Sequence, residues 1–102
     1  MSNFEQLIEK VRSKNAGPFW VTIDIFCRDE RGYQAALAVL DNQALAKLLQ
    51  CQPNQLKRFD IPDLGVIKIS LPRTQIQGTK EGRDMHGAAV AVLVEEHLAQ
   101  LL

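Results

Sequence analysis

The sequence is poor in cysteine and histidine, and it has no net charge. Its two cysteines, Cys27 and Cys51, lack the spacing of a metal knuckle or a redox pair, so free buried thiols in a reducing cytoplasm are expected. The two histidines, His86 and His97, are too far apart to share one helical turn, so no metal site and no cofactor are expected. Twelve basic and twelve acidic residues balance and are dispersed, so no nucleic-acid binding is expected.

Long apolar runs are also missing. No run approaches the roughly 20 residues that a helix needs to cross a bilayer, and Met1 leads into a polar segment rather than a signal peptide. We therefore expect a cytoplasmic protein without membrane contact. The length of 102 residues suits one domain that spans residues 1–102.

The chain begins with a helical pattern and continues with a strand. Ser2 and Glu5 form a capping box, and the apolar residues that follow have helical spacing, which predicts a helix over residues 3–13. Arg12 and Lys14 then lie near the negative end of this helix. Residues 19–27 alternate as a strand does, which assigns one face to four residues: Trp20, Thr22, Asp24 and Phe26.

Helix caps and turn residues divide the rest of the chain. Asp29 caps a second helix, Asp41 or Asn42 begins a short third one, and Pro53 suits the start of one further turn. Residues 58–61 and 66–71 form a predicted hairpin, and residues 73–83 form a polar loop. Residues 88–102 are predicted as a helix, although residues 90–94 also fit a strand.

These elements give the order α-β-α-α-β-β-α. A crossover from the first strand to a parallel strand, with the second arm of the hairpin between them, satisfies the rules for chain connections. The prediction is a two-layer α+β domain with a mainly antiparallel three-stranded sheet in the order 1-3-2, packed on helices.

The polar face of the predicted sheet is the first candidate site. Adjacent strands would bring Asp24 next to Lys68, and we expect these two residues to form an ion pair. Asp84 precedes His86 by two residues and either orients its imidazole for proton transfer or caps the terminal helix. The candidate catalytic residues are therefore Asp24, Lys68 and His86, and Asp84 is a candidate ligand-binding residue.

Cationic and amide side chains suggest a second site. The first loop adjoins the first strand, and the third strand ends just before Arg73, so we predict an anion-binding pocket for a small carboxylate or phosphate. Its predicted members are Arg12, Lys14, Asn15, Lys68 and Arg73. If Arg12 and Lys14 only stabilise the end of a helix, no pocket is needed.

Several segments together resemble a known family. They are residues 12–19 (Arg-Ser-Lys-Asn-Ala-Gly-Pro-Phe), residues 22–26 with Tyr33, residues 46–49, residues 67–69 with Pro72-Arg73, and Gly78 with Asp84, His86 and Gly87. With these residues the chain resembles the domain-of-unknown-function family 4387, small proteins found alone or fused to AtuA-like proteins, named for acyclic terpene utilisation. The resemblance covers nearly the whole chain. It implies an AtuA-like partner and the catabolism of organic acids or their thioesters, and it supplies no catalytic residue.

The chain departs from the pattern of this family at two points. Gln50-Cys51 stands where the family usually has a tyrosine, and Ala89-Val90 follows Gly87-Ala88 where the family tends to carry two glutamines. The leading hypothesis is an accessory domain or subunit that docks on a larger enzyme and contributes polar residues to a shared site. The alternatives are a standalone lyase or isomerase of small acids, which would use Lys68, Asp24 and His86, and a structural homo-oligomer that buries the same face.

Overall fold

The computed structural model describes residues 4–17, 20–49, 51–72 and 87–102, with side chains described from Val90 onward in the last range. Helices and strands alternate in groups along the chain. In order they are α1 (Phe4–Leu7), β1 (Ile8–Asn15), β2 (Trp20–Cys27), α2 (Glu30–Val39), α3 (Asn42–Leu48), the 3₁₀ turn η1 (Pro53–Gln55), β3 (Lys57–Ile61), β4 (Val66–Pro72) and α5 (Gly87–Leu101).

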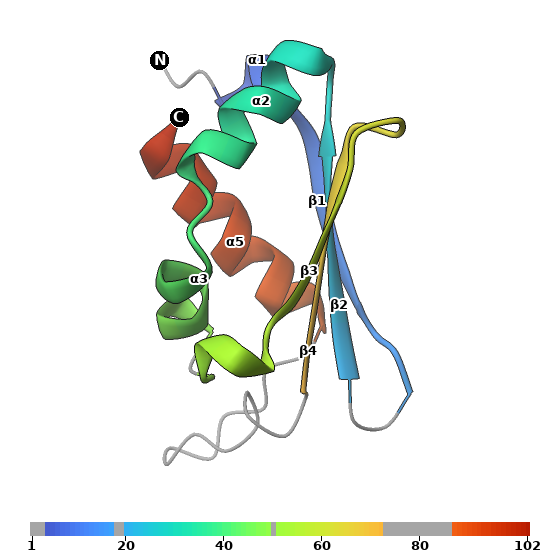
Figure 1. Ribbon diagram of the computed structural model, residues 1–102, viewed down its shortest axis with the longest axis vertical. Coiled ribbons are helices and arrows are strands. Elements are labelled where there is room, and N and C mark those ends of the chain that lie inside the picture. The colour runs from blue at the N-terminus through green and yellow to red at the C-terminus, as the bar shows by residue number, and fades with distance from the viewer. Residues whose placement is uncertain (1–3, 18–19, 50, 73–86) are drawn as a thin grey trace.

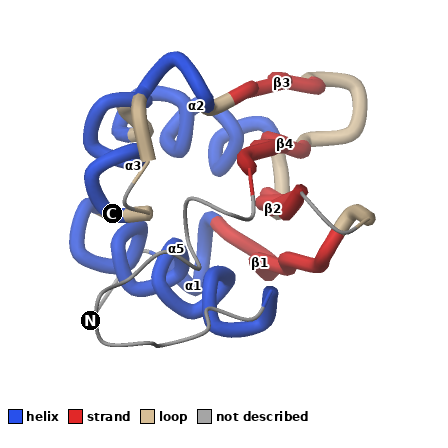
Figure 2. Tube along the Cα trace, turned by 90° about the horizontal axis from the view of Figure 1, so that it is seen from below, coloured by secondary structure: helices blue, strands red, loops and turns tan. Residues whose placement is uncertain are grey.

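The strands form one antiparallel sheet in the order β1-β2-β4-β3, and the helices gather on one of its faces (Figures 1 and 2). The α+β class and the helix-on-sheet arrangement are confirmed. The predicted three-stranded sheet in the order 1-3-2 is wrong in its strand number, because β1 pairs with the free edge of β2. Within the larger sheet, the three predicted strands keep their order as β2-β4-β3.

The predicted helix over residues 3–13 is wrong beyond its first turn. The chain is helical only over Phe4–Leu7 and then becomes β1. A β-bulge between Ile8 and Lys10 inserts one extra residue, so Ile8 and Val11 both face the helices although they are three residues apart. That spacing is also the spacing of a helix face, which is why the sequence pattern misleads here.

The helical layer follows the predicted caps. Asp29 accepts a hydrogen bond from the Gly32 N–H at 2.9 Å, and Asp41 accepts one from the Ala44 N–H at 3.3 Å. Pro53 begins the 3₁₀ turn as expected. Residues 90–94 are helical, within α5, which resolves the alternative between helix and strand.

Apolar side chains between the sheet and the helices form the core. The inward residues of the two central strands are fully buried: Val21, Ile23, Ile25, Ile67, Ile69 and Leu71. Val90, Val94 and Leu98 of α5 pack into the same cluster, whereas Leu101 near the end of this helix is 46% exposed. Cys27 is a buried free thiol, as predicted, and Cys51 is a half-buried one.

Two contacts join the start of the chain to the region between β2 and α2. The backbone N–H of Arg28 donates to the Leu7 carbonyl at 3.0 Å, and its side-chain Nε donates to the Glu5 carbonyl at 2.7 Å. Gly32 of α2 lies directly against the Leu7 carbonyl, where a Cβ atom would collide with the backbone. The helix α2 can therefore approach α1 closely only because residue 32 has no side chain.

None of the helices within the described residues is both long and apolar enough to span a membrane.

Candidate functional site

The face of the sheet turned away from the helices is the candidate site, and we call it the open face. The pairing register places side chains of all four strands on it. They are Lys10, Arg12 and Lys14 of β1; Trp20, Thr22, Asp24 and Phe26 of β2; Val66, Lys68, Ser70 and Pro72 of β4; and Lys57, Phe59 and Ile61 of β3.

Positive charge is concentrated on the open face. Five of the side chains that the register places on it are cationic, and Asp24 is the one acid among them; the exposed Glu9, in the bulge of β1, has no partner in this register. The whole chain has a formal net charge of zero, so the rest of the chain must carry a matching surplus of acids. The basic residues look dispersed in the sequence, yet the fold brings them together.

Aromatic rings lie among these cations. Phe59 is 52% exposed and Trp20 is 37% exposed. The Lys10 ammonium lies 5.0 Å from the centre of the Phe26 ring, and the Lys57 ammonium lies 5.1 Å from the Trp20 ring, both within the range of cation–π attraction. The face therefore offers apolar area as well as charge.

The predicted ion pair between Asp24 and Lys68 is confirmed. The two residues are direct partners in the register of β2 and β4, and Lys68 Nζ lies 3.9 Å from Asp24 Oδ1. This distance is too long for a hydrogen bond, and Oδ1 is covered without any hydrogen-bond partner in the described part of the chain. The Asp24 carboxylate therefore keeps unused acceptor capacity.

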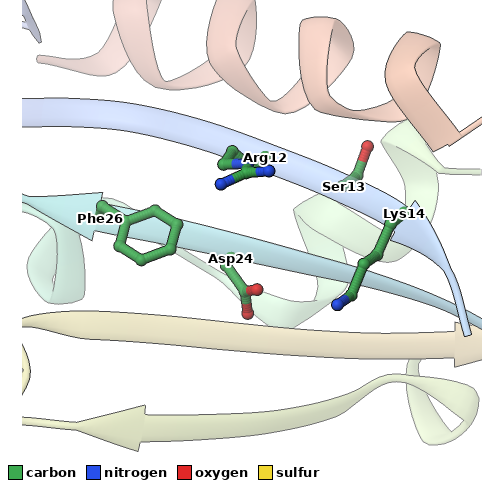
Figure 3. A pocket seen from close by; sticks show the side chains of 5 residues that line it. All are labelled: Arg12, Ser13, Lys14, Asp24 and Phe26. Atoms are coloured by element: carbon green, nitrogen blue, oxygen red, sulfur yellow. The ribbon is translucent and has the colours of Figure 1, made fainter.

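A hollow of about 130 Å³ lies on the open face beside Asp24. Its lining residues are Arg12, Ser13, Lys14, Asp24 and Phe26. In Figure 3, Lys14 extends from β1 across β2 toward the level of the Asp24 carboxylate, and Ser13 points the other way, toward α5. The Ser13 hydroxyl accepts a hydrogen bond from the Ala91 N–H at 3.0 Å, which fixes β1 against α5.

The cations of the hollow have no partner in the described residues. Arg12 lies directly opposite Asp24 in the register of β1 and β2, yet no ion pair within 4.0 Å joins them. Lys14, opposite Thr22, likewise has neither an ion pair nor a hydrogen bond to any described residue. Within the part of the chain that the structure describes, two cations without a partner therefore border a carboxylate that accepts no hydrogen bond.

The other predicted site residues have different positions. Asn15 ends β1 opposite Val21, a position of the helix-covered face, and it does not line the hollow. Arg73, Asp84 and His86 lie outside the described residues, so their predicted roles stay predictions. His97 is half-buried in α5, and its Nε2 is covered without a hydrogen-bond partner among the described residues.

Burial raises the pKa of three acidic groups of the helix-covered side. The Cys27 thiol has its pKa raised to about 11 by burial and, secondarily, by the Asp29 carboxylate. Burial also raises the pKa of Tyr33, to which the Asp60 carboxylate adds, and the pKa of the Cys51 thiol. All three groups are therefore neutral at physiological pH. No cluster of three or more potential metal ligands occurs among residues 4–17, 20–49, 51–72 and 90–102.

Sequence reasoning misses part of the open face. Lys57 and Phe59 alternate along β3. The strand predicted over residues 58–61 includes Phe59, and extending it by one residue would have placed Lys57 on the same face. Lys10 carries no usable signal, because the spacing of its segment predicts a helix.

A comparison with known protein families matches nearly the whole chain. The family DUF4387, described as a domain of unknown function, matches residues 4–96. The chain belongs to this family. Comparisons with curated proteins and with solved structures give no match. The DUF4387 match covers every strand of the sheet, so the open face lies wholly within the family domain.

Proposed function

We propose that this DUF4387 domain is an accessory subunit or module that docks through its open face onto an acidic surface of a larger protein. The observation that supports the proposal is the concentration of five cations and one acid in the register of the face turned away from the described helices, in a chain with no net charge. Complementary charge steers such encounters and selects partners. Exposed Phe59 and Trp20 would supply the apolar contact that a charged rim alone lacks.

The resemblance described above suggests which partner to test. It implies association with AtuA-like proteins, either as a separate chain or as a fused domain. Docking would place the hollow beside Asp24 at the interface, where residues of both proteins could form one site for an organic acid.

A homo-oligomer that buries the open face is the competing hypothesis. Two copies placed face to face would bring together two sets of five cations with only two carboxylates from the described residues. Like charges that meet in an interface oppose binding. We therefore expect the purified chain to be a monomer at physiological salt.

The proposal is tested by mixing the purified chain with a purified AtuA-like protein from the same organism. Light scattering after size exclusion and titration calorimetry should detect a complex whose affinity falls as salt rises. Lys10→Glu and Lys57→Glu should each weaken binding by at least about tenfold. Lys47→Glu is the matched control, because Lys47 is exposed on α3 in the helical layer.

Two results would overturn the proposal. One is the lack of a complex at low salt. The other is a complex that tolerates both substitutions on the open face but is disrupted by Lys47→Glu, which would place the interface on the helical layer.

A further inference from the structure

The hollow beside Asp24 combines three chemical features. Arg12 and Lys14 present positive charge without a partner in the described chain, the Asp24 carboxylate has unused acceptor capacity, and Phe26 adds an apolar wall. A ligand that satisfies all three needs an anionic group, a hydrogen-bond donor and a small carbon skeleton.

We propose that this hollow binds a small hydroxycarboxylic acid. The ligand carboxylate lies against Arg12 and Lys14, where the arginine can donate two parallel hydrogen bonds. The ligand hydroxyl donates to the carboxylate of Asp24, and the carbon chain contacts the Phe26 ring. The inference deepens the proposed function, since the hollow lies in the proposed docking face, but the free chain is sufficient for its test.

The size of the hollow limits the ligand. A volume of about 130 Å³ is close to that of an engineered cavity of about 150 Å³ that binds benzene, so the hollow has room for a small acid. Longer acids or thioesters would extend out of the hollow, over the open face.

Charge selects the hydroxy acid over other small acids with a donor. Arg12, Lys14 and Asp24 together carry a net positive charge, and Lys68 adds a further cation 3.9 Å from Asp24. An anionic hydroxy acid reduces this surplus, whereas a zwitterionic amino acid leaves it unchanged. A plain carboxylate reduces it equally but makes no hydrogen bond to Asp24.

The position of Lys68 supports the role of Asp24 as the acceptor. The Lys68 ammonium lies 3.9 Å from Asp24 Oδ1 and forms no hydrogen bond to it. Oδ1 itself is covered, so a ligand hydroxyl in the hollow reaches this 22%-exposed side chain at its other oxygen, Oδ2.

The test is a titration of the isotope-labelled full chain, followed by amide chemical shifts, with lactate and propionate as a matched pair. We expect lactate to bind about tenfold more tightly than propionate, since one additional hydrogen bond to a charged acceptor is of that order. The shifted amides should belong to residues 12–14 and 24–26. Alanine, as a zwitterion, should bind more weakly than lactate.

Variants test separately the contacts proposed for the hydroxyl and for the carboxylate of the ligand. Asp24→Asn should remove the preference for lactate while propionate binding is retained, and Lys14→Gln should weaken both acids. Lys57→Gln, a cation of the open face outside the hollow, should change neither. Should Asp24→Asn fail to fold, Lys14→Gln and the lactate–propionate comparison still test the proposal.

Three outcomes would overturn the inference: no shift at millimolar lactate, equal affinity for lactate and propionate, or inorganic phosphate binding more tightly than lactate. The last two would assign a general anion site. Because the titration uses the free chain, these failures are distinct from failure of the docking proposal, which is measured with the partner protein and with Lys10→Glu and Lys57→Glu.

Discussion

The two faces of one sheet have opposite characters. On the face that the helices cover, Val21, Ile23 and Ile25 of β2 are fully buried. On the open face the residues between them in the same strand, Thr22 and Asp24, are polar and partly exposed. A strand presents consecutive residues to opposite sides, so the core residues and the residues of the proposed binding face stand at alternate positions of the same eight residues. Substitutions at neighbouring positions of the strand should therefore have very different effects on the stability of the protein.

The largest expected difference is between Ile23→Ala and Thr22→Ala. Ile23 is 0% exposed in the centre of the sheet, so its truncation should lower the free energy of unfolding by about 2–5 kcal/mol. Thr22→Ala should cost less than about 1 kcal/mol, the range of strand propensity. Chemical denaturation measures both, and equal costs would contradict the division of the two faces.

The second prediction concerns an added methyl group on each side. Gly32→Ala should destabilise the protein by about 2–3 kcal/mol, because the new Cβ collides with the Leu7 carbonyl and forces α1 and α2 apart. Ser70→Thr adds a methyl to the open face and should change stability by less than about 0.5 kcal/mol. Thermal unfolding of the two variants tests this, and a neutral Gly32→Ala would show that the helical layer can adjust.

The third prediction uses the thiol of the covered face. Folding raises the pKa of Cys27 from 9.0 to about 11, so the folded state holds the thiol proton more tightly than the unfolded state. The contribution of this group to stability is complete below pH 9 and is lost as pH rises through about 11, where roughly 2 kcal/mol should be missing.

The measurement is the pH dependence of urea unfolding between pH 8 and about pH 11, in Cys51→Ser and in the same variant with Cys27→Ala. The variant that retains Cys27 should lose more stability with rising pH. Parallel curves would show that Cys27 ionises equally well in the folded and unfolded chains.

The smallest expected effect belongs to the ion pair of the open face. Asp24 and Lys68 have side chains that are 22% and 43% exposed, so their coupling should be only about 0–1 kcal/mol. A double-mutant cycle with Asp24→Asn and Lys68→Met measures it. A coupling of about 3 kcal/mol or more would indicate a desolvated pair, which this exposure does not provide.

Sequence patterns predict the elements in which local and tertiary preferences agree. The strict alternation of residues 20–27 and the caps at Asp29 and Asp41 are local signals, and each corresponds to the expected element. The prediction fails for β1 because the identity of this strand depends on pairing with β2 and on a bulge that local spacing does not reveal. The polar loop predicted over residues 73–83 lies outside the described residues.

The candidate site is predictable where strand parity determines it. Parity and adjacency of the strands are sufficient to place Asp24 beside Lys68. From the sequence, Arg12 and Lys14 are expected at the end of a helix, beside a loop that borders an anion pocket. In the structure they belong to a strand and line the hollow because they alternate along β1. The five cations of the open face come together only when β1 is recognised as a strand, and its pairing with β2 is visible only in the three-dimensional structure.

The bulge in β1 also determines where this chain can change its length. Ile8 and Lys10 lie opposite Cys27 and Phe26, which are consecutive in β2. Removing Glu9 would therefore make β1 a regular strand in which all remaining residues keep their present side of the sheet. Removing Ser13 would instead turn either the residues before it or those after it to the opposite side. We therefore expect natural length variation in this strand to occur at position 9. The spacing from Lys10 to Lys14 should stay fixed among proteins that keep the cations of β1 on the open face.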